Sequence, residues 1–275
     1  MKFSILIANY NNAHFFVKEC YTSIIEQTYR DFEVIIVDDK STDNSIEVIE
    51  AQIKNDERFI LYKNDKNKGI GFTKRKLIDL ATGDVCAFLD PDDSLSKKAL
   101  ELSIKEYKKN SKIVATYSKL MLCNANLQAV RLHPWSAEIP KNDPYFFNIQ
   151  NEIHHFFTFR KDIYLQTDGI NPIYKIAEDQ DNFMKLYEKG EFKFIPEVLY
   201  NYRIHNGGIS SLTNKMKAKI WFAIVIFEAC KRRNIPFDVE LVLRDVLNIS
   251  KIKIQFENTI LFRGIFKCYR FLYGK

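Results

Sequence analysis

The sequence predicts an α/β fold in which a Rossmann-like, mostly parallel, doubly wound sheet carries helices on both faces. Over residues 1–118, short apolar runs alternate with segments whose apolar residues recur at helical spacing. The apolar runs are continuous rather than alternating, as is typical of strands covered on both sides. With 275 residues and 46% hydrophobic residues, the chain is long enough to bury a sizeable core.

Each element of this first part follows from its own pattern. Helix 13–27 places Phe16, Cys20 and Ile24 on one face, and Ser41 or Thr42 is expected to cap a helix that carries Ile46, Ile49 and Ile53. Two more helices are predicted at 73–81 and at about 96–108. The predicted strands are 3–8, 33–37, 59–62, 85–89 and 113–117.

The remaining chain divides into two further parts. Residues 119–214 are rich in aromatic residues and proline, and we expect them to form the second half of the same domain as residues 1–118. Residues 215–275 predict a helical tail, which holds 13 Lys and Arg against 5 Asp and Glu. The basic surplus of this chain therefore belongs to the tail. A basic tail favours nucleic acid or an anionic membrane surface, and no nucleic-acid motif supports the first.

The sequence favours a cytoplasmic protein. The apolar start, 3–8, is too short for the core of a signal peptide, and the longest apolar run, 220–227, is too short to span a bilayer. The five cysteines are scattered and include no C-x-x-C pair, which argues against a disulfide framework and a zinc ribbon and suits a reducing compartment.

Polar and acidic residues follow the predicted strands at the point where each one ends. Asn9 to Asn11, Asp38 to Ser41, Asn64 to Asn67 and Asp90 to Asp93 all fall there. Ligands of open parallel sheets bind at this edge. Carboxylates that lie close together need a cation or protons, and oxygen ligands favour Mg²⁺ or Mn²⁺. The sequence therefore predicts a metal-assisted site for a phosphorylated, nucleotide-bearing ligand, with Tyr10 able to stack on a base.

A purely structural explanation of the same residues stays open, because aspartates after strands often cap helices and shape turns. Other nucleotide and hydrolase motifs are missing. The loop after the first strand contains no glycine, Gly69-Ile70-Gly71 lacks the third glycine of a dinucleotide fingerprint, and no Walker A, H-E-x-x-H or G-x-S-x-G motif occurs.

Six motifs in order resemble those of the family 2 glycosyltransferases, which have the GT-A nucleotide-diphospho-sugar transferase fold. The resemblance covers roughly residues 3–211. The similar segments are Phe3 to Asn11, Val37-Asp38-Asp39-Lys40-Ser41-Thr42-Asp43, Asn67-Lys68-Gly69 through Arg75, Phe88-Leu89-Asp90-Pro91-Asp92-Asp93, Ala177-Glu178-Asp179 with Leu186, and Tyr202-Arg203-Ile204-His205 with Ser210. Ala8 stands where the family usually has Pro, and Lys76 where it often has Asn.

The resemblance implies a role for each matching residue. Residues 1–118 would bind the nucleotide sugar and the metal, and residues 119–214 the acceptor. Asp179, with Glu178 beside it, would supply the general base. The metal, Mn²⁺ or Mg²⁺, would be held by Asp92, Asp93 and His205. The nucleotide would be bound by Ala8, Tyr10, Asp39, Asn67, Gly69, Arg75, Asp90 and Asp92, with Asp39 on the base.

The implied activity is that of an inverting, metal-dependent glycosyltransferase that moves one sugar from a nucleotide-diphosphate sugar, most simply a UDP-sugar, to a glycan or lipid-linked acceptor. Surface polysaccharide synthesis would use such an enzyme. The Q-x-x-R-W element of processive family members is absent, which favours transfer of a single sugar. A nucleotidyltransferase that makes a nucleotide sugar and a non-catalytic nucleotide- or sugar-binding module are the alternatives.

Several residues admit a structural explanation. Glu178-Asp179 would also suit a helix start, His205 a loop, and Arg203 a surface ion pair. His154-His155 has no third metal ligand at suitable spacing and reads as structural or acceptor-lining. A helix at 259–273 would carry apolar residues on one face and basic residues on another. This pattern suits the inner face of a membrane or packing on the domain.

Overall fold

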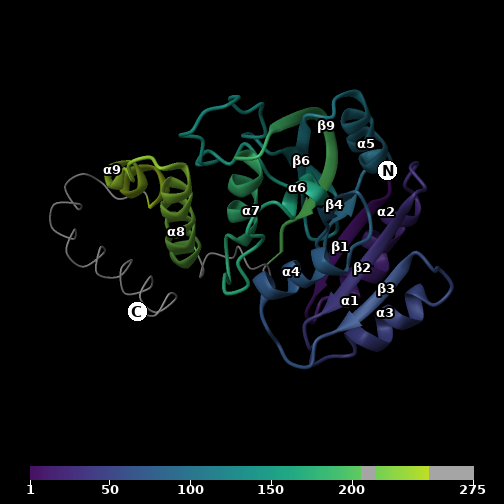
Figure 1. Ribbon diagram of the computed structural model, residues 1–275. Coiled ribbons are helices and arrows are strands. Elements are labelled where there is room, and N and C mark those ends of the chain that lie inside the picture. Colours follow the sequence, from purple (N-terminus) through teal and green to yellow (C-terminus); the bar gives the residue numbers. More distant parts are fainter. Residues whose placement is uncertain (206–214, 248–275) are drawn as a thin grey trace.

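A single mixed sheet forms the centre of the molecule (Figure 1). The computed structural model describes residues 1–205 and 215–247, and within these ranges nine strands pair in the order β3-β2-β1-β4-β8-β6-β9-β5, with β7 beside β6. The strands are β1 (Phe3–Asn9), β2 (Phe32–Asp38), β3 (Phe59–Lys63), β4 (Val85–Phe88), β5 (Ser94–Leu95), β6 (Ile113–Cys123), β7 (Ala129–Leu132), β8 (Thr158–Arg160) and β9 (Glu191–Arg203).

The sheet is mostly parallel, as predicted. The strands β3, β2, β1 and β4 run parallel to one another, and so do β6 and β9. The short strand β8 separates the two groups and pairs antiparallel with both β4 and β6. β6 continues well past the predicted end at residue 117, so this one strand crosses the predicted boundary at 118 and joins both halves in one sheet.

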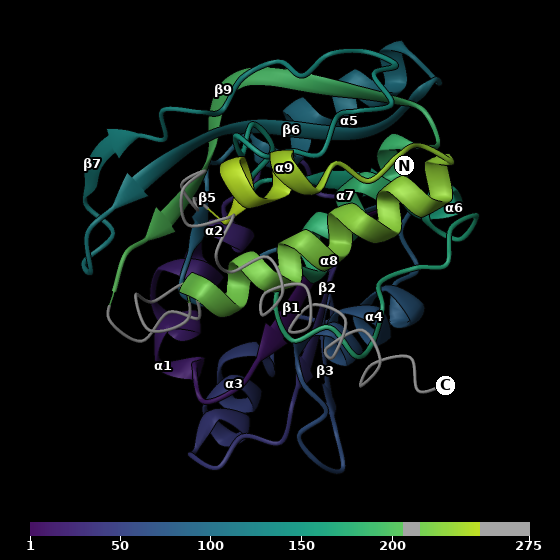
Figure 2. The same ribbon diagram turned by 90° about the vertical axis from the view of Figure 1, so that its left-hand side faces the viewer.

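Helices cover both faces of the sheet (Figures 1 and 2). One face packs against α1 (Ala13–Phe15), η1 (Phe16–Cys20), α2 (Tyr21–Ile25), α3 (Ser45–Ile53) and α5 (Ala99–Lys109). The other packs against α4 (Ile70–Leu80), α6 (Lys161–Tyr164) and α7 (Glu178–Tyr187). Within β1, Ile5 and Ile7 face the first set of helices and Leu6 the second, because successive side chains of a strand alternate.

A third layer covers the outer side of α7. It consists of α8 (Lys215–Arg233), α9 (Val239–Leu241) and η3 (Val242–Val246), and in Figure 1 it lies beyond α7 on the side away from β1. Met184 of α7 packs against Ala223 and Ile226 of α8, and Arg232 and Arg233 both bond to Glu188. The predicted helix after residue 213 is therefore present in this part, and residues 248–275, which include the predicted helix 259–273, lie outside the described residues. In residues 1–205 and 215–247, no helix combines the length and the apolar character needed to cross a bilayer.

Two local predictions were wrong. The helix α3 begins at Ser45, and neither Ser41 nor Thr42 caps it, because the Ser41 hydroxyl donates to Asp38 instead. The predicted continuous helix 13–27 contains a turn of π-helix, η1, between α1 and α2. Such turns often occur at functional sites, and this one contacts the loop that follows β4.

Candidate active site

The ends of β1 and β2 are fastened together by one carboxylate. Asp38 accepts hydrogen bonds from the Asn9 side-chain amide at 2.8 Å, from the Ser41 backbone N–H at 2.8 Å and from the Ser41 hydroxyl. Asp38 is fully buried, so these bonds replace the water that its charge loses. Asp38 thus fixes the ends of β1 and β2 to each other, and the neighbouring Asp39 is directed toward the loop after β3.

Asp39 holds the start of α4. Its Oδ1 accepts from the Asn64 side-chain amide at 2.7 Å and from the Lys68 N–H at 2.9 Å, and its Oδ2 accepts from the Gly69 N–H at 2.8 Å. Gly69 has φ +85°, a left-handed conformation that favours glycine. The carboxylate therefore positions the Asn67–Gly69 segment, in addition to the base contact that the sequence predicts.

The loop after β4 meets the end of β9 at the predicted metal residues. Asp92 Oδ2 and His205 Nε2 lie 2.8 Å apart. Burial raises the pKa of Asp92, the nearby Asp90 raises it further, and the contact with His205 opposes both effects. A divalent cation at this point would relieve the repulsion between the carboxylates, so the residues present fit the predicted ion. Across the described ranges, no group of three or more His, Cys, Asp or Glu side chains is arranged to hold a metal by itself.

Asp93 has a different environment from Asp92. Its Oδ2 accepts from the Tyr200 hydroxyl at 2.7 Å and its Oδ1 from the Arg203 backbone N–H at 2.7 Å. Asp93 is only 1% exposed, and the Tyr200 hydroxyl also accepts from the Asp90 N–H at 3.2 Å. Both oxygens of Asp93 are thus used to fasten β9 to the loop, which leaves Asp92 and His205 as the better placed metal ligands.

Arg203 is buried in the same junction, so the alternative explanation as a surface residue does not hold, although Arg203 does pair with Glu19. Its guanidinium donates to the Asp92 carbonyl and to the Ala125 carbonyl, each at 2.6 Å, and to Glu19 Oε2 at 2.8 Å. The group also lies over the Phe15 ring, 4.8 Å from its centre. Sequence reasoning missed this role because Tyr202-Arg203 ends a strand, where an exposed arginine is equally common.

The π-helical turn supports the loop from the other side. Glu19 supplies the acceptor for Arg203, and the fully buried Cys20 thiol contacts the Asp90 carbonyl at 3.8 Å. Burial raises the pKa of Cys20 well above its ordinary value, and the carboxylates after β4 add to the effect. Cys20 is therefore a neutral packing group.

Glu178 and Asp179 are adjacent, so their spacing in the sequence cannot tell which of them would act as the base. In the structure the two side chains have different surroundings. Glu178 is buried and accepts from the Lys74 ammonium of α4 at 2.6 Å. Asp179 is only half-buried, and its Oδ1 accepts from the Gln180 N–H. The two acids are more than a charged helix start, because the first of them forms a buried ion pair across the site.

The segment 168–174 lies against α4. Arg75 donates to the carbonyls of Asp168 and Ile170 at 3.2 and 3.3 Å. Gly71 has no side chain to separate α4 from this segment, since an added Cβ would lie 2.5 Å from the Tyr174 carbonyl oxygen. Arg75, predicted to line the nucleotide pocket, thus contacts the segment 168–170 in this structure.

The other predicted residues lie around these groups. Ala8 lies one residue before the end of β1 and pairs with Val37, and Tyr10 is 48% exposed just beyond the strand. Asn67 is exposed in the loop before α4. Tyr10 therefore has the accessibility that stacking on a ring requires.

The adjacent histidines His154 and His155 pack against aromatic rings. His155 stacks on Tyr200 and Tyr202 with ring centres 5.0 and 6.0 Å apart. His154 meets the ring of His133 at 3.9 Å, and burial lowers the pKa of His154 to about 3. These contacts support the structural explanation of the pair.

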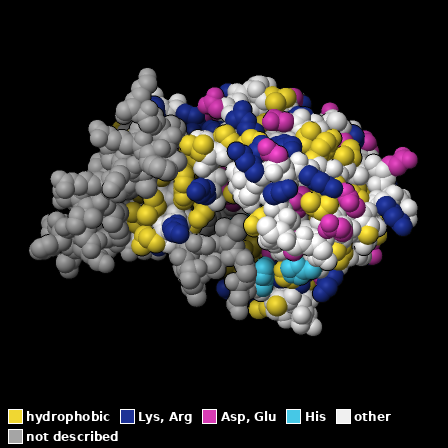
Figure 3. Space-filling view, turned by 90° about the horizontal axis from the view of Figure 1, so that it is seen from below, with side chains coloured by type: hydrophobic (Ala, Val, Ile, Leu, Met, Phe, Trp, Pro, Cys, Tyr) yellow, Lys and Arg dark blue, Asp and Glu magenta, His cyan; other side chains and the backbone are white. Residues whose placement is uncertain are grey.

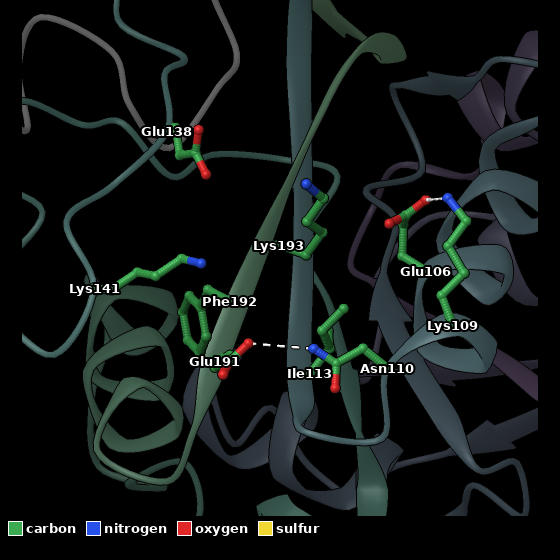
Figure 4. A pocket seen from close by; sticks show the side chains of 9 residues that line it. All are labelled: Glu106, Lys109, Asn110, Ile113, Glu138, Lys141, Glu191, Phe192 and Lys193. Carbon is green, nitrogen blue, oxygen red and sulfur yellow. Dashed lines mark hydrogen bonds and ion pairs between the residues drawn. The ribbon is translucent and has the colours of Figure 1, made fainter.

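Figures 3 and 4 show the charge distribution on one face and a separate hollow of the molecule. In Figure 3, basic and acidic side chains are interspersed over the described part of the face shown. A hollow elsewhere on the molecule contains none of the predicted site residues (Figure 4). Its lining combines lysines and glutamates at the ends of α5 and the start of β9, including Lys109, Lys193, Glu106 and Glu191.

The fold is the GT-A fold of glycosyltransferases. The sequence matches the family described as "Glycosyl transferase family 2" over residues 4–167. The chain belongs to this family.

Relatives of this chain include two chondroitin synthases. The one from Pasteurella multocida is 30% identical over 84% of this chain and 23% of its own length, and the one from Escherichia coli is 31% identical over 75% and 29%. This chain thus spans only about a quarter of their lengths. The "putative teichuronic acid biosynthesis glycosyltransferase TuaG" of Bacillus subtilis is 29% identical over 80% of this chain and 85% of its own length.

Solved structures with the same fold include two nucleotide-sugar complexes. TarS 1-349 of S. aureus in complex with UDP-GlcNAc superposes with a TM-score of 0.67 at 19% identity, covering 95% of this chain and 75% of that one. The mannosyltransferase PcManGT of Pyrobaculum calidifontis, in complex with GDP-Man and Mn²⁺, gives 0.61 at 15% identity, covering 90% and 68%.

Proposed function

We propose that this protein is an inverting, metal-dependent glycosyltransferase that transfers one sugar from a nucleotide-diphosphate sugar to a hydroxyl of a glycan or lipid-linked acceptor. The observation that carries the proposal is that two groups of acidic residues, one after β4 and one at the start of α7, have different surroundings. Asp90 and Asp92 lie in the loop after β4, where Asp92 contacts His205, and Asp179 lies in the first turn of α7. The Lys74 ammonium donates to Glu178, the residue before Asp179, at 2.6 Å, and the charges of Asp90 and Asp179 help to raise the pKa of Lys74.

The donor half has the features that a nucleotide diphosphate requires. Tyr10 offers an exposed ring for the base, and Asp39 orders the backbone of the Asn67–Gly69 segment beside it. Asp92 and His205 would hold the divalent ion, Mn²⁺ or Mg²⁺. When bound, this ion would offset the charge that develops on the departing diphosphate. A UDP-sugar is our first choice of donor, since TarS is described in complex with UDP and with UDP-GlcNAc.

The reaction is a single displacement at the anomeric carbon. The acceptor oxygen forms a bond to this carbon as the bond to the diphosphate oxygen breaks, and the nucleoside diphosphate leaves with the bonding electrons. Asp179 accepts the proton of the acceptor hydroxyl, because a carboxylate within hydrogen-bond reach assists a weak nucleophile. Attack from the side opposite the leaving group inverts the anomeric configuration.

Surface polysaccharide synthesis is the process that we propose for this activity, because the named relatives include chondroitin synthases and a putative teichuronic acid biosynthesis enzyme. A lipid-linked acceptor would place the protein at the inner face of a membrane. The amphipathic pattern of residues 259–273 supports this location. Co-sedimentation with anionic liposomes, compared between the full chain and a chain ending at residue 250, tests it, and equal recovery of the two would refute it.

Product analysis tests the activity. The protein is incubated with Mn²⁺, short oligosaccharide acceptors and each of UDP-GlcNAc, UDP-glucuronic acid and GDP-mannose, and the products are measured by mass spectrometry. We expect an acceptor heavier by one sugar residue, together with free nucleoside diphosphate. Formation of a nucleotide sugar from a sugar phosphate and a nucleoside triphosphate, with release of pyrophosphate, would instead identify a nucleotidyltransferase.

A further inference from the structure

Lys74 is a buried cation on a helix face that is otherwise apolar. It belongs to α4, where Leu77 and Ile78, three and four positions further on, pack in the core. Its ammonium donates to Glu178 Oε1 at 2.6 Å, although the two residues are 104 positions apart in the sequence. The side chains are only 7% and 8% exposed. This pair joins a helix of the donor half to the first residue of α7.

More than one carboxylate surrounds this cation. Burial alone would lower the pKa of Lys74, but Glu178 raises it above its ordinary value, and Asp90 and Asp179 raise it further. The ammonium also lies 5.1 Å from the centre of the Phe88 ring, at the end of β4. Lys74 is thus a protonated group that interacts with an acid of the donor half and with both acids at the start of α7.

The charge of Lys74 has a consequence for the site. Carboxylates that lie close together and away from water repel each other. They move apart or take up protons unless a cation lies near them. Lys74 supplies such a cation from the protein itself. Glu178 in turn fixes the first turn of α7, and Asp179 is the next residue of this turn.

We propose that Lys74 is a positioning residue for sugar transfer, whose charge, through Glu178 and beside Asp90, holds Asp179 at the working distance from the bound donor. This inference rests on the proposed function and goes beyond it, because Lys74 lies within the similar segment from Asn67 to Arg75 but receives no role from the resemblance. Lys74 itself touches neither the donor nor the acceptor. A pair that served the fold alone would be replaceable by apolar side chains of similar size, often without loss of stability.

Two variants separate a positioning charge from a packing pair. Lys74→Met leaves Glu178 buried without its cation, whereas the double variant Lys74→Met/Glu178→Leu removes both charges. We expect the double variant to melt at a higher temperature than Lys74→Met, because no buried charge stays unpaired. Its kcat for transfer should still be at least about tenfold below wild type, since small displacements of a reacting group cost that much, with the KM for the donor within about threefold.

Lys185 of α7 offers a matched control. It forms another buried ion pair, 2.7 Å from Asp181 Oδ2, and also donates to the Gly169 carbonyl. Lys185→Met should lower the melting temperature, because it leaves the buried Asp181 without its cation. The kcat of the folded protein should stay within about threefold of wild type, because Asp181 is not one of the acids that we propose for the site.

The outcomes distinguish the two proposals. If the wild type transfers sugar and the double variant has the melting temperature and the kcat of the wild type, the positioning role is wrong and the pair serves packing. If the double variant loses donor affinity as strongly as transfer, Lys74 supports the donor pocket and the assignment is also wrong. If the wild type transfers no sugar from any donor, the proposed function fails first.

Discussion

Asp92 Oδ2 and His205 Nε2 lie 2.8 Å apart although the two residues are separated by 113 positions. The contact exists because β9 ends beside the loop that follows β4, where Asp93 accepts from Tyr200 and from the Arg203 backbone. The metal ligands that we propose thus come from two segments that are far apart in the sequence. The buried Asp93, through its bonds to Tyr200 and Arg203, holds these two segments together.

Nucleotide binding should depend on a divalent cation. In isothermal titration calorimetry, UDP should bind at least about tenfold more weakly when a chelator replaces Mn²⁺, equivalent to about 1.4 kcal/mol. Asp92→Asn should bind UDP equally with and without Mn²⁺, because one of the two proposed ligands is lost. Equal UDP affinity of the wild type under both conditions would remove the metal from the account.

Tyr200 should stabilise the fold more than an isolated hydroxyl does. Tyr200→Phe removes the donor to Asp93 and the acceptor for the Asp90 N–H and leaves the buried Asp93 oxygen unsatisfied. We expect urea denaturation to show a loss of about 1–3 kcal/mol in the free energy of unfolding. The cost should be absent in Tyr145→Phe, a control at a tyrosine that is 61% exposed, if the Asp93 bond is the cause.

Asp39 should contribute to nucleotide affinity through the loop as well as through the base. Asp39→Ala removes the acceptor of the Lys68 and Gly69 N–H groups, so the Asn67–Gly69 segment loses its anchor. We expect weaker binding of UDP by about tenfold or more, a cost typical of one or two charge-assisted hydrogen bonds. Pyrophosphate, which has no base, should bind nearly as before. A parallel loss for both would assign Asp39 to the fold instead.

Glu33 predicts how stability depends on pH. Burial opposes its ionisation, but hydrogen bonds from Lys2, Ser4 and Thr82 prevail and lower its pKa to about 2. Because the folded pKa lies below the unfolded value of about 4.5, the ionised group stabilises the protein above pH 4.5, and this contribution disappears as the pH falls toward 2. Glu33→Gln should therefore unfold at lower urea than the wild type at pH 7, and the difference between the two should shrink below pH 4.5. A constant difference would contradict this.

The strands were predictable where their own residues carry the signal. The buried runs β1 and β2 are found within one residue of the predicted ranges, because a strand that is covered on both faces is apolar throughout. The strand β8 has only three residues and owes its place to partners far away in the sequence, with Arg160 opposite Val85. Such long-range pairing leaves no local pattern.

The site was predictable in its acids and not in the groups that hold them. Asp90, Asp92 and Asp179 stand out because carboxylates follow a strand or begin a helix. Lys74 carries one local signal, a lysine three and four positions before two core residues, and nothing nearby names Glu178 as its partner. The burial of Arg203 likewise depends on Glu19 and Ala125, which only the folded chain brings together.

The kinetics of Asp179→Asn test the central claim most directly, namely that the donor half binds and the acceptor half supplies the base. The substitution keeps the size of the side chain and removes its basic oxygen. We expect kcat for transfer to fall by about 10²–10⁴, a typical value for general-base assistance, while the affinity for UDP with Mn²⁺ stays within a few-fold. Near-full transfer by Asp179→Asn, or a loss of UDP affinity as large as that of Asp92→Asn, would contradict the account.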